Sequence, residues 1–246
     1  MCSSDLIATP DHSHAYIAMA CMRVGKHVYV QKPIAHNVFE ARTLTEAARA
    51  HKVVSQMGNQ GHSGEGIRQV TEWIAAGLIG KVREVHAWTN RPIWPQSSEM
   101  GRPTDEQKAP DGMDWNQWCG PAAFRPFHAS YHPGKWRAWW DFGTGSLGDM
   151  GCHIIDPIFM SLNLRYPSSV EGNVSTVFET FGKKTTGKFE SYPRSSIARF
   201  KFPARGDMPP VTLTWWDGGL MPQRPDELED DMPFGDPNGG CLFVGD

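Results

Sequence analysis

The chain has 246 residues, of which 39% are hydrophobic and 21% charged, and its formal net charge is −3. These values are typical of a soluble globular protein with one large or two modest domains. The slightly negative charge argues against nucleic acid or an anionic membrane as a partner. The five cysteines are scattered and form no Cys-x-x-Cys pair, which favours reduced thiols over a disulfide framework or a zinc site. No apolar run is long enough to cross a membrane.

The two ends of the sequence predict a fragment. Residues 1–6 contain neither a signal peptide nor a helix start, and they resemble a translated adapter tail that is not native. Residues 239–246 stop inside a predicted strand and turn. We therefore expect further chain at both ends.

The first quarter of the chain alternates between strand and helix patterns. Short apolar or β-branched runs predict strands, and stretches with helical spacing of apolar residues predict helices. Asp11 is the expected N-cap of the first helix and Gly25 its end. The strands are predicted at 6–10, 27–33 and 53–60, and the helices at 14–24 and 37–51. This order is typical of a doubly wound α/β fold with a parallel sheet.

Polar or turn-forming residues follow each of these strands. They are Thr9-Pro10, Gln31-Lys32-Pro33 and Gly58-Asn59-Gln60. Open α/β sheets bind ligands beyond the carboxyl ends of their strands. We therefore expect the three segments to share one crevice.

The remaining chain has a different character. A helix is predicted at 64–77 and a half-buried strand at 80–90, and residues 90–131 are Pro-rich and irregular. An aromatic and basic stretch at 133–142 precedes a helix predicted at 148–164. Alternating runs then predict an antiparallel sheet. They lie at 169–179, 195–202 and 210–216, before an acidic, Pro-rich loop at 224–236.

A Gly-rich turn at 143–148 leads into a segment with candidate catalytic residues. Asp149 and His153 are four residues apart and would share one helical face, which Asp156 continues. A carboxylate there can orient an imidazole, and an imidazole is a natural proton acceptor at neutral pH. The alternative is an amphipathic helix with a buried, hydrogen-bonded His153. The Gly-x-Gly-x-x-Gly pattern in the turn does not follow a buried strand, so we do not interpret it as a phosphate loop.

Four motifs together resemble one enzyme family. Ile7-Ala-Thr-Pro-Asp-His-Ser-His14, Val28-Tyr-Val-Gln-Lys-Pro33, Gly80-Lys-Val-Arg83 and the segment 145–156 are similar to the glucose-fructose oxidoreductase, inositol dehydrogenase and MocA (Gfo/Idh/MocA) family, in family order over almost the whole chain. The resemblance implies part of an NAD(P)-binding Rossmann domain at residues 1–62. An α+β domain with an open, mostly antiparallel sheet follows at 63–246. It also implies NAD or NADP as cofactor and a sugar, cyclitol or related polyol as substrate.

The resemblance also assigns roles to single residues. Lys32, Asp149 and His153 match the family's catalytic lysine, acidic residue and acid/base histidine. The cofactor-lining segments match Thr9, Pro10, His12, His14, Gln31, Lys32, Pro33, Asn59 and Gln60. Lys135, Trp136 and Arg137 precede the catalytic motif and are predicted to line the substrate pocket with Lys32, Asp149 and His153; an aromatic packing cluster is the alternative. No metal site is expected, because His128 and His132 lack the spacing of a known one.

Two departures from the family pattern bear on function. Gln31 replaces the usual Glu of Glu-Lys-Pro, which removes a charge near the cofactor ribose. The first Rossmann strands, with their glycine phosphate loop, are not in the sequence, so we expect the chain alone to bind cofactor poorly.

Three functions are compatible with the sequence. The first is NAD(P)-dependent oxidation or reduction of a polyol. The second is a transient oxidation by bound NAD that ends in elimination or glycoside cleavage, and the third is non-catalytic sugar binding. We expect a homo-oligomer formed through the open sheet, and a cytoplasmic location by default, with an upstream export signal as the open alternative.

Overall fold

The computed structural model describes residues 3–176, 178–180, 183–184 and 189–246. The chain divides into two compact units, and each is described by itself. The first unit comprises Met1–Asn59, Trp94–Asp149 and Thr186–Tyr192. The second comprises Gln60–Ile93, Met150–Thr185 and Pro193–Asp246.

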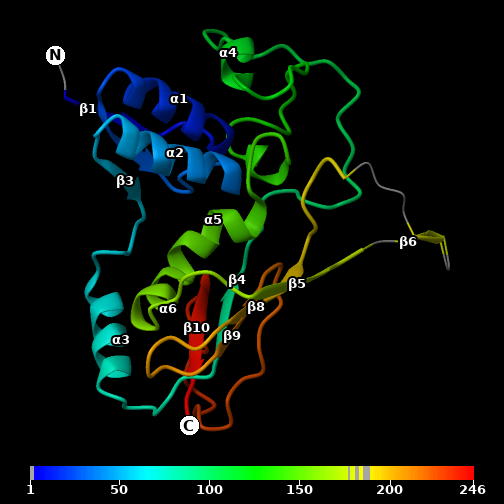
Figure 1. Ribbon diagram of the computed structural model, residues 1–246. Helices are drawn as coiled ribbons and strands as arrows, with labels where there is room; N and C mark the ends of the chain where they lie inside the picture. Colours follow the sequence, from blue (N-terminus) through cyan, green and yellow to red (C-terminus); the bar gives the residue numbers. More distant parts are fainter. Residues whose placement is uncertain (1–2, 177, 181–182, 185–188) are drawn as a thin grey trace. The chain divides into compact units, whose positions relative to one another are not determined.

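A three-stranded parallel sheet organises the first unit. Its strands are β1 (Ser4–Ile7), β2 (His27–Gln31) and β3 (Ser55–Gly58), in that order, joined by α1 (Asp11–Arg23) and α2 (Val38–Ala50). The two helices lie side by side (Figure 1). The buried core beneath them is aliphatic and includes Ile7, Ala18, Met22, Val28, Val30 and Leu44. The predicted α/β class with a parallel sheet is confirmed.

The start of α1 differs from the prediction. Pro10 takes the N-cap position, without a side-chain cap, and Asp11 is the first helical residue. The Asp11 carboxylate instead accepts a hydrogen bond from Thr144 Oγ1 at 2.7 Å. A tertiary partner has therefore replaced the local capping role that spacing alone suggested. In α2, by contrast, Asn37 does cap the helix, since its side chain accepts from Glu40 N at 2.9 Å.

The Pro-rich segment of the first unit folds around buried rings. We call Trp115, Phe127, Tyr131, Trp136, Trp139 and Phe142 the aromatic cluster; all are at most 9% exposed. α4 (Trp115–Cys119) and the short 3-10 helix η1 (Lys135–Ala138) carry part of it. The indole N–H groups of Trp115 and Trp139 donate to the carbonyls of Arg125 and Ser130 at 2.7 and 2.9 Å. The irregular backbone is therefore held by large buried rings, two of which also hydrogen-bond to it through their indole N–H groups.

A mixed five-stranded sheet forms the second unit. Its order is β10-β4-β9-β8-β5, with β4–β9 parallel and the other pairs antiparallel. α3 (Glu65–Ala75) and α6 (Asp156–Ser161) pack against each other (Figure 1). The strands are β4 (Glu84–Thr89), β5 (Ser169–Val174), β8 (Ser196–Phe202), β9 (Val211–Trp216) and β10 (Gly239–Val244). The expected open, mostly antiparallel sheet is confirmed.

Two predicted elements of the second unit are divided. The run expected at 169–179 forms β5 and then β6 (Phe178–Thr180), which pairs with β7 (Lys183–Lys184) in a separate two-stranded sheet. Residue 177 lies outside the described residues.

The predicted helix at 148–164 is also two helices. α5 (Gly145–Ile154) begins three residues earlier than expected, and α6 begins at Asp156. Pro157 at the start of α6 has no backbone N–H, so it cannot continue the hydrogen-bond ladder of α5. Asp156 is therefore the first residue of a new helix.

Candidate active site

The carboxyl ends of β1 and β2 open onto a polar cavity of about 330 Å³ in the first unit. Seven of the predicted site residues line it, as do three others. The predicted ones are Thr9, Pro10, His14, Gln31, Lys32, Trp136 and Arg137; the others are Ala8, Asp11 and Pro133. The position agrees with the rule that open α/β sheets bind ligands beyond their strand ends. Lys135, by contrast, is exposed, and its Nζ donates to the Ala129 carbonyl at 3.3 Å.

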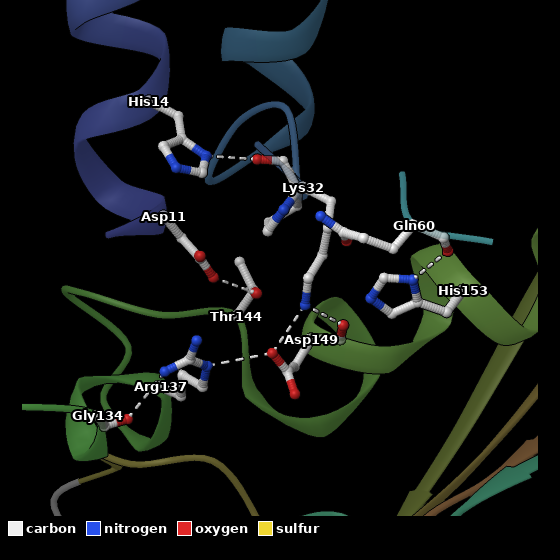
Figure 2. Close-up of polar contacts among 10 residues, drawn as sticks. Asp11, His14, Lys32, Gln60, Gly134, Arg137, Thr144, Asp149 and His153 are labelled. Atoms are coloured by element: carbon white, nitrogen blue, oxygen red, sulfur yellow. Dashed lines mark hydrogen bonds and ion pairs between the residues drawn. The ribbon is translucent and has the colours of Figure 1, made fainter. Parts of the chain in front are cut away.

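Lys32 and Arg137, which line the cavity, both pair with the carboxylate of Asp149 (Figure 2). Lys32 Nζ donates to Asp149 Oδ1 at 2.9 Å and to the Asp149 carbonyl oxygen at 2.6 Å. Arg137 Nε donates to the same Oδ1 at 3.1 Å. The three residues come from the end of β2, from α5 and from η1, so one carboxylate fixes two cations from distant parts of the sequence.

The electrostatics of the three residues favour a negatively charged or electron-rich oxygen. The side chains of Lys32 and Asp149 are only 15% and 12% exposed, so water screens their charges weakly. Two cations share one carboxylate, which leaves one positive charge in excess. An ammonium group has three donors, and Asp149 takes two of them. The third can serve a ligand oxygen.

Asp11 is a cavity residue that sequence reasoning assigned only to a helix cap. It is 5% exposed. Burial raises the pKa of its carboxyl group, while the Thr144 hydrogen bond and the charges of His14, Arg137 and Lys32 oppose this rise. Its place directly after Thr9-Pro10 was the available signal, because that segment follows a strand end.

His12 and His14, both on α1, have different surroundings. His14 is 1% exposed, and its Nδ1 and Nε2 lie 2.7 and 2.6 Å from the carbonyl oxygens of Pro33 and Thr9. His12 packs against Trp118 and Phe142, and burial lowers its pKa. His12 does not line the polar cavity. A cofactor contact by His12 therefore remains only a prediction.

His153 lies on α5, and its ring is oriented within the second unit. Its Nδ1 is 2.9 Å from the Gln60 carbonyl oxygen. A carbonyl can only accept, so Nδ1 carries the proton and Nε2 of the neutral ring is the basic nitrogen. Gln60, predicted from its place after β3 with Asn59, thus contributes its backbone to the tautomer of His153. The predicted orienting role of Asp149 stays a prediction; its carboxylate accepts hydrogen bonds from Lys32 and Arg137.

The glycines before α5 serve close packing. A Cβ on Gly143 would lie 2.5 Å from Arg137 Cα and 2.7 Å from its carbonyl oxygen. Gly145 has a φ of +62°, and a Cβ there would meet the Tyr192 ring at 2.7 Å. Both glycines follow η1 and no strand of the parallel sheet, as the rejection of a phosphate loop requires.

The described residues offer neither a metal-binding cluster nor a membrane-spanning helix. Within them, no group of three or more His, Cys, Asp or Glu side chains is arranged to hold a metal ion. Among the helices they form, none combines the length and the apolar character that a bilayer span requires. His128, considered as a metal ligand, pairs with Asp105 and Ser130.

Comparison with known proteins decides the family. Residues 4–59 match the family model described as oxidoreductase family, NAD-binding Rossmann fold. Residues 65–180 match its companion, oxidoreductase family, C-terminal alpha/beta domain. The chain belongs to the Gfo/Idh/MocA oxidoreductase family. The resemblance inferred from the four sequence motifs is therefore confirmed.

Relatives of this family member include a characterised sugar dehydrogenase. Levoglucosan dehydrogenase of Pseudarthrobacter phenanthrenivorans is 26% identical over 150 residues, which are 61% of this chain and 30% of that protein. A solved WlbA dehydrogenase from Bordetella pertussis, in complex with NADH and UDP-GlcNAcA, has a TM-score of 0.61 at 16% identity. That match covers 100% of this chain and 58% of the other. Apo levoglucosan dehydrogenase gives 0.59 at 17%, covering 98% and 52%. The chain spans about half the length of these structures.

Proposed function

We propose that the protein is an NAD(P)-dependent oxidoreductase that acts on a sugar, cyclitol or related polyol. The observation that carries this proposal is the Lys32 ammonium group, held at the end of a parallel strand by Asp149 in a polar cavity. A fixed, poorly screened cation with a remaining donor suits the oxygen of a reacting alcohol.

The chemistry of the cavity wall fits one end of a nicotinamide cofactor. Its lining combines strand-end backbone, the amide of Gln31 and the cations Lys32 and Arg137. Thr9, Pro10, Gln31, Lys32 and Pro33 would hold the group there, with Asn59 and Gln60 at the third strand end. When bound, the nicotinamide supplies the hydride acceptor or donor.

The chain's own residues would handle the proton and the charge. His153 has its Nδ1 proton directed to Gln60, so its Nε2 would take the proton of the substrate hydroxyl group. Lys32 would stabilise the negative charge that develops on the substrate oxygen. Asp149 and Arg137 would keep the Lys32 ammonium group in place. Trp136, which lines the cavity, and Lys135 stay proposed substrate contacts.

The relatives support the substrate class. Levoglucosan dehydrogenase, by its name, oxidises a sugar derivative, and a levoglucosan dehydrogenase has been solved with NADH and levoglucosan. An inositol dehydrogenase homologue from Azotobacter vinelandii has been solved with NADH and myo-inositol. These ligands are all polyhydroxylated rings, so the proposal names that class and no single compound.

The test uses the complete gene product with NAD or NADP and a panel of sugars, cyclitols and anhydrosugars. We expect at least one compound to give net formation of reduced cofactor, detected by its absorbance. Turnover without release of reduced cofactor would favour transient oxidation followed by elimination or glycoside cleavage. Sugar binding without any turnover would contradict the proposal and favour a binding protein.

A further inference from the structure

The environment of His14 constrains the charge of its ring. Its Nδ1 lies 2.7 Å from the Pro33 carbonyl oxygen and its Nε2 lies 2.6 Å from the Thr9 carbonyl oxygen. Carbonyl oxygens cannot donate a hydrogen bond. A neutral imidazole has only one N–H, so one ring nitrogen would face an oxygen with its lone pair at a hydrogen-bonding distance.

Rotating the ring by half a turn does not remove this conflict. It would place ring carbons where the two nitrogens now lie, at 2.6 and 2.7 Å from the oxygens. Carbon–oxygen contacts of C–H groups are normally about 3.3–3.6 Å long. Both positions therefore require N–H donors.

We propose that His14 is held as a doubly protonated imidazolium that joins the carboxyl-terminal ends of β1 and β2 and thereby positions Lys32. The ring is 1% exposed, so a charge there needs a compensating partner. Asp11 lies three residues earlier on α1, on the same helical face, and is itself 5% exposed. The attraction between these two charges lowers the pKa of Asp11 against the larger effect of burial.

The charged groups near His14 come from three parts of the fold. Asp11 belongs to α1, Lys32 follows β2, and Arg137 lies on η1. Lys32 and Arg137 also act on Asp11 electrostatically, and both are bound to Asp149. The carboxylates of Asp11 and Asp149 thus lie among three cations, His14, Lys32 and Arg137.

The consequence for Lys32 follows from the chain path. Pro33, whose carbonyl lies against His14 Nδ1, is the next residue after Lys32. Thr9, whose carbonyl lies against His14 Nε2, follows β1 and lines the same cavity as Lys32. Two short hydrogen bonds to one charged ring fix the two loops relative to each other. The ring nitrogens of His12, two residues earlier, also face two carbonyl oxygens, but at longer distances. They are 3.0 Å from the Trp118 oxygen and 3.3 Å from the Phe142 oxygen, so a single N–H suffices there, and burial lowers the pKa of His12.

Nuclear magnetic resonance of the 246-residue chain with nitrogen-labelled histidine tests the charge. At neutral pH we expect both ring nitrogens of His14 to carry protons and only one of His12 to do so. The variants His14→Gln and His12→Gln assign the signals, and through-bond correlations to the backbone assign them if either variant fails to fold. One unprotonated ring nitrogen in His14 would overturn the proposal. This experiment needs neither cofactor nor substrate, so it is independent of the proposed function.

A second measurement tests the positioning role, which rests on the proposed function. Asp11→Asn keeps the side-chain shape and removes the counter-charge, so the doubly protonated fraction of His14 should fall at neutral pH. In the complete gene product, kcat should fall at least about tenfold as Lys32 loses its fixed place. Unchanged kcat across the pH range, with an active wild type, would overturn the positioning role. An inactive wild type would contradict the proposed function instead.

Discussion

The polar cavity and the aromatic cluster of the first unit use the same short segment in different ways. Within residues 133–144, Arg137 lines the cavity, Trp139 and Phe142 belong to the aromatic cluster, and Trp136 belongs to both. In the cluster, the indole N–H of Trp139 donates to the Ser130 carbonyl. The guanidinium group of Arg125 pairs with Asp141 and lies over the Tyr131 ring. In the cavity, the Lys32 ammonium group keeps one donor beyond those bound to Asp149.

The difference indicates which region performs chemistry and which holds it in place. A buried aromatic side chain such as Trp139, whose indole N–H is bound to a backbone carbonyl, contributes mainly to stability. A charged group with a fixed position and a remaining donor can stabilise charge on a reacting molecule. Substitutions in the cluster should therefore change folding, whereas substitutions of cavity residues and of the proposed base should change turnover.

His153→Ala should have the largest effect on turnover, because it removes the side chain proposed to take the substrate proton. We expect kcat of the complete gene product to fall about 10²–10⁴-fold, because a positioned general base is lost. Cofactor affinity should change little, and Asp149→Asn should cost less than the loss of the imidazole. His62→Ala, which removes another exposed imidazole of the second unit, is the control. A near-normal rate per folded molecule in His153→Ala would end the case for His153.

Trp139→Ala should have the largest effect on folding. Trp139 is 1% exposed and packs its ring 5.0 Å from that of Tyr131, so its removal leaves a cavity. We expect a loss of about 3–5 kcal/mol in the free energy of unfolding, measured with urea. Phe124, 63% exposed, should tolerate alanine within about 0.5 kcal/mol. A loss below about 1 kcal/mol in Trp139→Ala would remove the distinction between the regions.

Lys32→Met should lower turnover and leave folding nearly unchanged, the reverse of what is expected for Trp139→Ala. We expect kcat/KM to fall about 10²–10³-fold, the usual worth of one donor to a developing oxyanion. The unfolding transition should hardly move, because Arg137 still pairs with the Asp149 carboxylate. Lys108→Met changes an exposed lysine that pairs with Asp111 and should leave kcat/KM near wild type. Equal losses in the two lysine variants would contradict the assignment of Lys32.

Gly143→Ala should have the smallest effect, and it affects both regions at once. The new methyl group would meet the Arg137 backbone at 2.5 Å, which the neighbouring chain can relieve only by moving. We expect a destabilisation of about 1–3 kcal/mol. Gly66→Ala on α3 meets no atom within 4 Å and should be neutral or stabilise by up to about 1 kcal/mol. Equal unfolding midpoints for the two variants would show that the close approach at Gly143 is unimportant.

Local sequence patterns determined most of the secondary structure. The parallel strands and their two helices were predicted within a few residues, since hydrophobic periodicity and turn residues act over short distances. The same local rules failed where a distant partner or a helix break decided the outcome. Asp11 was predicted to cap α1 but binds Thr144, and the single helix at 148–164 is divided at Ile155, just before Pro157.

The sequence by itself also placed Lys32, Asp149 and His153 in one family motif set, because residue types and order are visible without coordinates. Only the tertiary structure decided what each one touches. The Asp149 carboxylate binds Lys32 and Arg137, and the tautomer of His153 is set by the carbonyl of Gln60. The two short contacts of the His14 ring were equally invisible in the sequence. Hydrogen bonds between residues far apart in the chain depend on distances that folding sets, and backbone carbonyls, which every residue has, leave no signature in a sequence.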